Sequence, residues 1–183
     1  MDFNEYVPLA VSTENKNNPV SKLPFNSSDR LQHATMGMIT EVGELVDIYK
    51  CCLYYGELLD HINIKEELGD LCWYLALAAD VLKLEFDPPL KLNQSTVSCL
   101  QLAIQEIAKM LDNADDEASE ETFEHTITHM LLLVNTIAAN TNISLSDVLN
   151  KNIAKLKQRY PKKFTSSDAI NRDIAQEREV LNQ

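Results

Sequence analysis

The chain has 183 residues, of which 45% are hydrophobic and 24% are charged, and its formal net charge is -12. This length and composition are typical of one globular domain with its own core, and they exclude a largely disordered chain. The strong negative charge argues against nucleic acid and acidic membrane surfaces as partners, and it favours the binding of cations.

The sequence carries no sign of a membrane or export segment. The longest uncharged apolar run covers residues 71–79, far short of the roughly 20 residues that a membrane-spanning helix needs. The first residues have neither a basic start nor an apolar core, so we expect a cytoplasmic protein. The four cysteines lack C-x-x-C spacing, which favours reduced thiols over disulfides or a zinc site.

Apolar residues recur at three- and four-residue spacing along nearly the whole chain, which predicts an all-α fold. A short first helix is expected over residues 3–10. Ser28 is the expected N-cap of a long second helix over about 29–53, and Gly56 marks the turn after it. A third helix is expected over about 60–85, because the two prolines that follow forbid its continuation.

Three further helices are expected in the second half of the chain, and a last one over about 168–181. The apolar stripe of the fourth consists of Val97, Leu100, Ile104, Ile107 and Leu111. The stripe of the fifth consists of Phe123, Ile127, Met130, Val134 and Ile137. Ser144, with Asp147 three residues on, begins the sixth, which Pro161 ends.

The second and third expected helices share a short acidic motif. It reads E-x-G-E at residues 41–44 and E-x-G-D at residues 67–70, with 22 residues between the two. Acids three residues apart lie about 60° apart around a helix, so each pair projects from one side. Each motif also falls three or four residues from apolar stripe positions. We therefore expect four carboxylates along the buried face: Glu41, Glu44, Glu67 and Asp70.

None of these acids has a basic residue three or four positions away on its own helix. Packed without compensation, they would destabilise the fold or bind protons. A hard divalent cation resolves the conflict, because Mg²⁺ prefers carboxylate oxygens, with Mn²⁺ as a substitute. Gly43 and Gly69, each costing about 1 kcal/mol relative to alanine inside a helix, are expected to let the two helices approach closely.

Residues 33–84 resemble the MazG-like, all-α nucleoside triphosphate pyrophosphohydrolases, whose signature is E-x-x-E followed after a gap by E-x-x-D. A second similarity is N-x-x-K-L followed by R-Y at residues 152–160. The resemblance implies cleavage of an NTP or dNTP to the monophosphate and pyrophosphate. The four acids would hold Mg²⁺, and a metal-activated water would attack the α-phosphate.

The substrate in such a reaction needs cationic and polar contacts of its own. Lys50, Lys155 and Arg159 are candidates for the phosphates. Tyr74 lies one turn after Asp70 and is a candidate for the sugar or base, while Trp73 either stacks on the base or fills the core. Asn152, one turn before Lys155, is a candidate for a base edge or a phosphate.

The chain departs from the family pattern in two ways. Thr40 stands where many members have an extra glutamate, so the acid that orients the water stays open among Glu41, Glu44 and Glu66. The chain is also longer than compact members. We expect one domain over residues 1–183, divided into a core of about 28–85 and 141–165, a helical insertion of about 86–140, and a C-terminal helix of about 166–183.

Two other interpretations fit parts of the sequence. His125 and His129, four residues apart, have the spacing of a zinc pair but lack a nearby third ligand in the sequence. A non-catalytic nucleotide sensor or oligomeric adaptor on the same scaffold is the main alternative to an enzyme. In either case we expect a homodimer or homotetramer, because the family usually assembles and two long helices leave apolar surface to cover.

Overall fold

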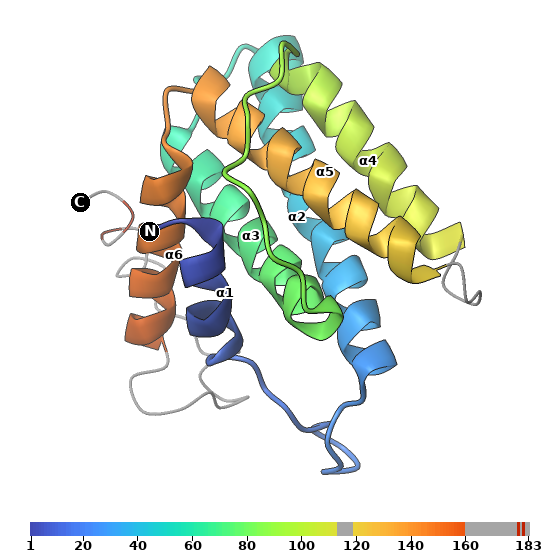
Figure 1. Ribbon diagram of the computed structural model, residues 1–183. Helices are drawn as coiled ribbons and strands as arrows, with labels where there is room; N and C mark the ends of the chain where they lie inside the picture. Colours follow the sequence, from blue (N-terminus) through green and yellow to red (C-terminus); the bar gives the residue numbers. More distant parts are fainter. Residues whose placement is uncertain (113–118, 160–178, 180, 182–183) are drawn as a thin grey trace.

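The computed structural model describes residues 1–112, 119–159, 179 and 181. Within these residues the chain forms six α-helices and no β-strand, so the all-α prediction is confirmed (Figure 1). The helix expected over about 168–181 falls almost wholly outside the described residues. None of the six helices has both the length and the apolar character to cross a membrane. The helices are α1 (Phe3–Val11), α2 (Ser27–Tyr55), α3 (His61–Leu82), α4 (Thr96–Asp112), α5 (Ser119–Asn140) and α6 (Leu145–Arg159).

Helix α2 begins slightly earlier than the sequence pattern predicts. Its N-cap is Asn26, whose side chain accepts a hydrogen bond from the Asp29 amide, and the Asp29 carboxylate accepts one from the Asn26 amide. Ser28 as the cap is therefore wrong, because this reciprocal pair satisfies the first amides of the helix better than a lone hydroxyl. Gly56 ends α2 as predicted, with a left-handed φ of 73°.

The ends of α3 and α6 also follow from local chemistry. Asp60 caps α3 by accepting from the amides of Ile62 and Asn63. The helix ends at Lys83, which has a φ of 58°, so it stops before the predicted boundary and before the two prolines. Helix α6 begins as predicted, since the Ser144 hydroxyl accepts from the Asp147 amide at 3.0 Å. The predicted stop at Pro161 lies outside the described residues.

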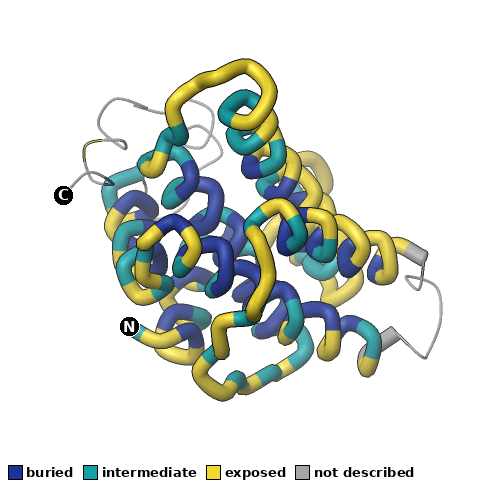
Figure 2. Tube along the Cα trace, turned by 90° about the horizontal axis from the view of Figure 1, so that it is seen from above, coloured by how far each residue is buried: buried dark blue, intermediate teal, exposed yellow. Residues whose placement is uncertain are grey.

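Helix α3 lies at the centre of the molecule. It contacts α2 along most of its length, α1 and α6 on one side and α5 on the other, and α4 packs against α2 and α5 (Figure 1). Figure 2 shows the buried residues gathered where these helices meet. Residues 75–79 of α3 are all buried, which requires neighbours on every side of the helix.

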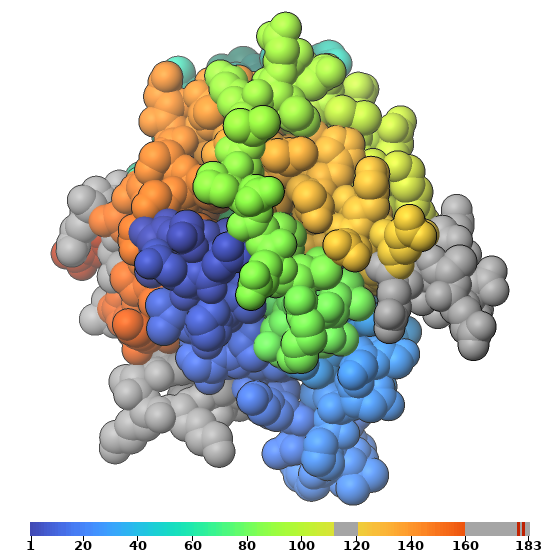
Figure 3. All heavy atoms as spheres, in the orientation of Figure 1, coloured from blue at the N-terminus to red at the C-terminus, as the bar shows by residue number. Residues whose placement is uncertain are grey.

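The segment 83–95, which joins α3 to α4, runs across the surface between α1 and α5 (Figure 3). The Asn4 amide donates to the Phe86 carbonyl at 2.8 Å, and its oxygen accepts from the Phe86 amide at 3.0 Å. Asn135 of α5 donates to the Pro89 carbonyl at 2.9 Å. These bonds hold the segment 83–95 against α1 on one side and α5 on the other.

The fourth and fifth predicted helices form, but the buried face of α4 differs from the predicted stripe. Its outer positions Val97, Ile104 and Leu111 are 40%, 52% and 53% exposed. They lie roughly 100° around the helix from the centre of the buried face, which a spacing pattern does not resolve. The buried positions of α4 are Cys99, Leu100, Ala103, Glu106, Ile107 and Met110.

Candidate metal site

Three carboxylates meet where α2 and α3 cross the middle of the molecule. Glu41 comes from α2, and Glu67 and Asp70 come from one side of α3. One oxygen from each lies within 4.8 Å of the other two. Glu67 is only 6% exposed, while Glu41 and Asp70 are half-buried. Three of the four predicted acids thus converge.

The electrostatics of the cluster follow from burial of like charges. Burial, with the charge of Asp70 next in importance, raises the pKa of Glu41 to about 7. Burial, followed by the charges of Glu44 and Asp70, raises the pKa of Glu67 to about 9. The two side chains are hydrogen-bonded, and two carboxylates make such a bond only when one is protonated. Without a cation, the pair therefore holds a proton near neutral pH.

Asp70 is different, because α6 supplies it with partners. Lys155 Nζ donates to both Asp70 oxygens, at 2.7 and 2.6 Å, and it lies 3.4 Å from Glu66 Oε1. Asn152 Nδ2 donates to Asp70 Oδ1 at 2.8 Å. The expectation of four unpartnered acids is therefore wrong for Asp70, because its cation comes from a helix distant in sequence. Glu41 and Glu67 have no lysine or arginine partner in the part of the chain that the structure describes.

Glu44 does not join the cluster. It lies on the exposed surface of α2, near enough for its charge to act on Glu67. Its predicted role as a ligand stays a prediction. Its position lies about 60° around α2 from Glu41, on the side further from the buried residues of α2.

The glycines have different roles from those expected. A Cβ on Gly43 would meet nothing within 4 Å, so the expected close approach of helices at Gly43 is wrong. On α2 it is Gly37 that faces α3, since a Cβ there would lie 2.1 Å from a ring carbon of Tyr74. A Cβ on Gly69 would lie 2.9 Å from Nδ2 of Asn152. Gly69 therefore makes room for α6 rather than for α2.

The predicted substrate contacts divide into two groups. Lys155 and Asn152 lie at the cluster, but both are buried and bonded to Asp70. Lys50 is exposed, forms an ion pair with Asp47, and lies on the opposite side of α2 from Glu41, so the structure does not bring it to the cluster. Arg159 is half-buried at the last position of α6, one turn beyond Lys155.

Tyr74 belongs to an aromatic group beside the carboxylates. Its ring makes edge contacts with Trp73 and His33, at centroid distances of 5.1 and 5.6 Å. The Trp73 indole donates to the Ala10 carbonyl at 3.1 Å and to the Thr13 hydroxyl at 2.9 Å. Trp73 thus fastens the end of α1 to α3, which favours the core-filling alternative for this residue. The predicted contact between Tyr74 and a nucleoside stays a prediction.

Sequence reasoning missed Tyr6, which lies beneath the cluster. Its side chain is fully buried, and its hydroxyl donates to Asn152 Oδ1 at 2.6 Å. The spacing of α1 marks Tyr6 only as an apolar stripe residue. No local pattern indicates a bond to a helix 146 positions further along the chain.

One member of the histidine pair, His129, contacts a buried acid of α4. His129 Nδ1 lies 2.9 Å from Glu106, a buried acid of α4 that also accepts from Lys109 and Thr126. Among the described residues, Glu41, Glu67 and Asp70 are the single group of three or more potential ligands close enough to share an ion.

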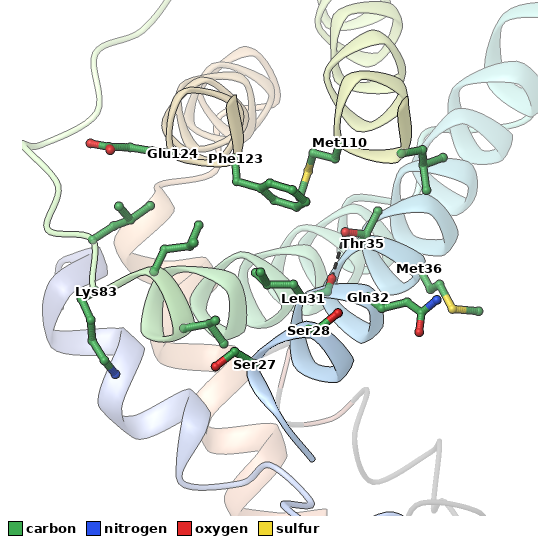
Figure 4. Close-up of a pocket in the computed structure, with 14 residues that line it drawn as sticks. Ser27, Ser28, Leu31, Gln32, Thr35, Met36, Lys83, Met110, Phe123 and Glu124 are labelled. Carbon is green, nitrogen blue, oxygen red and sulfur yellow. Dashed lines mark hydrogen bonds between the residues drawn. The ribbon is translucent and has the colours of Figure 1, made fainter. Parts of the chain in front are cut away.

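A cavity of about 720 Å³ lies away from the carboxylates, between the start of α2 and the facing ends of α4 and α5 (Figure 4). Met110 and Phe123 project into it from α4 and α5, and Leu31 from α2. Thr35 also lines it, but its hydroxyl donates to the Leu31 carbonyl at 2.9 Å. None of the predicted site residues lines this cavity.

The fold and the site together define an all-α protein with a half-buried carboxylate cluster between two long helices. The donor set fits a hard divalent cation, since it offers three carboxylate oxygens close to one another and no sulfur. Comparison with protein-family models, curated proteins and solved structures finds no match to this chain.

Proposed function

We propose that this protein is a magnesium-dependent nucleoside triphosphate pyrophosphohydrolase, which cleaves an NTP or dNTP to the monophosphate and pyrophosphate. One observation carries the proposal. The two sequence elements that resemble the MazG-like enzymes, separated by more than 80 residues, meet at one carboxylate: Asn152 and Lys155 both bind Asp70. A chance similarity between amphipathic helices would not be expected to place the residues of both elements in contact.

Glu41, Glu67 and Asp70 would hold the cation, and Mn²⁺ would serve in place of Mg²⁺. When bound, such an ion binds phosphate oxygens and makes a coordinated water more acidic. Glu67 must give up its proton before its oxygens and those of Glu41 can both act as ligands. Binding of the cation to Glu41 and Glu67 would therefore release that proton.

The residues of α6 have a supporting task in this proposal. Lys155 and Asn152 fix both oxygens of Asp70 from the protein side, so its carboxylate is held in one orientation. Lys155 is fully buried, so it acts on Asp70 and places positive charge near the site rather than reaching out to solvent. Tyr74, beside Asp70 on α3, is the nearest candidate for a nucleoside contact.

A release assay tests the proposal. Pyrophosphate would be measured for a panel of NTPs and dNTPs with Mg²⁺, using the wild type, Glu67→Gln and Asp70→Asn. We expect turnover of at least one nucleotide and a loss of about 100-fold or more in each variant. Glu57→Gln, which removes an exposed acid just beyond α2, is the matched control and should keep full activity.

The same assay separates the enzyme from the alternative of a nucleotide sensor or oligomeric adaptor. If the wild type binds a nucleotide but releases no pyrophosphate from any member of the panel, the enzyme proposal fails and the sensor stands. We also propose that the protein is a cytoplasmic homodimer or homotetramer. Light scattering on the purified chain tests the assembly, and a strict monomer would contradict it.

A further inference from the structure

A chain of buried hydrogen bonds connects α1 to the carboxylate cluster through α6. Tyr6 donates to Asn152 Oδ1 at 2.6 Å, and Asn152 Nδ2 donates to Asp70 Oδ1 at 2.8 Å. Tyr6 is 0% exposed and Asn152 is 1% exposed. Three helices that are distant in sequence thus meet in one polar contact within the core.

The chemistry of these groups fixes the direction of every bond. An ionised carboxylate only accepts hydrogen bonds, so the Asn152 amide must present its NH₂ group to Asp70. Its oxygen then faces α1, where it needs a donor. The Tyr6 hydroxyl is the donor to that oxygen among the described residues. Without the hydroxyl, neither orientation of the amide satisfies both of its ends.

The surrounding backbone makes this arrangement specific. A Cβ on Gly69 would lie 2.9 Å from Nδ2 and 3.0 Å from Cβ of Asn152, so only glycine leaves room for the amide. The Tyr6 ring is held by stacking on Phe3, with centroids 5.8 Å apart. The hydroxyl is therefore placed by rigid neighbours and not by a mobile side chain.

We propose that Tyr6 is a positioning residue for the cation site, acting on Asp70 through Asn152. The inference rests on the cation site of the proposed function, although it does not require catalysis. The Tyr6 hydroxyl fixes the amide of Asn152, and the amide together with Lys155 orients the carboxylate of Asp70. Groups that orient a metal ligand in this way commonly set the affinity of the site.

Mn²⁺ binding tests this directly, measured by calorimetry and by electron spin resonance at neutral pH. Tyr6→Phe keeps the ring and removes the hydroxyl, and we expect a Kd for Mn²⁺ about tenfold weaker than that of the wild type. Asn152→Leu should weaken binding by at least as much. The double variant should bind no more weakly than Asn152→Leu alone, because both changes interrupt the same path.

Two controls separate positioning from general loosening. Ile127→Ala opens a cavity in the buried face of α5, outside the path from Tyr6 to Asp70, so it should lower Tm but leave the Kd within about twofold of the wild type. Tyr54→Phe removes a hydroxyl from an exposed tyrosine (78% exposed) and should change neither quantity. If Ile127→Ala weakens Mn²⁺ binding as much as Tyr6→Phe does, the effect is structural and the proposal is overturned.

The remaining outcomes are equally decisive. Equal Mn²⁺ affinity for Tyr6→Phe and the wild type overturns the role of Tyr6, whether or not the protein hydrolyses nucleotides. Weaker binding by Tyr6→Phe in a protein that cleaves no nucleotide supports positioning and contradicts the proposed enzyme. A wild type that binds no Mn²⁺ at all overturns both.

Discussion

The stability of the metal-free protein should fall as pH rises, because of the proton held by Glu41 and Glu67. The pKa of Glu67 is raised from 4.5 to about 9 in the folded state. Between these values the folded chain binds more protons than the unfolded chain. The stabilising contribution is therefore complete below the unfolded pKa and is lost as pH rises through the folded pKa.

The size of the effect follows from one proton. Each pH unit within this range removes about 1.4 kcal/mol per extra proton bound, so a rise from about pH 5.5 to 7.0 removes about 2 kcal/mol. The neighbouring acids Glu41 and Asp70 are half-buried, so solvent reaches the cluster. We therefore expect about half of that value, about 1 kcal/mol.

Glu67→Gln provides the comparison, because glutamine keeps the shape and an N–H donor but takes up no proton. Urea unfolding with EDTA across this pH range should give a flatter curve for the variant than for the wild type. At the upper end the variant should be the more stable of the two. Glu57→Gln, which changes an exposed acid, should run parallel to the wild type. Parallel curves for the wild type and Glu67→Gln would refute the buried proton.

Three further changes test the contacts that hold the site in place. Gly69→Ala should lower the free energy of unfolding by about 1–2 kcal/mol in urea melts, because its Cβ meets Asn152. Gly43→Ala should raise the free energy of unfolding by about 0.5–1 kcal/mol, because its Cβ meets nothing and alanine favours the helix. Lys155→Met should cost about 2 kcal/mol at neutral pH, since it leaves Asp70 without its cation, and an unchanged melt would show that the pair contributes nothing. Arg30→Ala should cost about 3 kcal/mol in the same assay, because the guanidinium joins Glu14 and Asp80 at 2.8 Å each and the Glu14 side chain is only 2% exposed.

The sequence predicted those parts of the fold that depend on neighbours along the chain. Periodic apolar residues located all six helices, and Gly56 and Ser144 marked an end and a beginning correctly. The pattern located the face of α4 less well. Val97, Ile104 and Leu111 satisfy helical spacing as well as the buried residues do. Only contact with α2 and α5 decides which of two adjacent faces is covered.

The candidate site was likewise predicted only where it depends on residues that are near one another in the sequence. The two motifs lie on consecutive helices joined by a short turn, which was enough to expect Glu41 near Glu67 and Asp70. It could not show that Glu44 is exposed and lies outside this group, since that depends on how far α2 is rotated against α3. Nor could a search for cations on the same helix find Lys155, whose bond to Asp70 spans 85 positions.

Asp70 connects the fold to the proposed chemistry, because the groups that orient it also fasten α6 and α1 to α3. Lys155, Asn152 and Tyr6 are all fully or almost fully buried, so their polar atoms must be satisfied inside the protein, and Asp70 is the acceptor around which they gather. The opposite edge of the cluster has no such compensation. There Glu41 and Glu67 have no lysine or arginine partner among the described residues, and burial raises the pKa of both. In the proposed site, one edge would therefore stay fixed while the other exchanges a proton for the cation, as a reversible metal site requires.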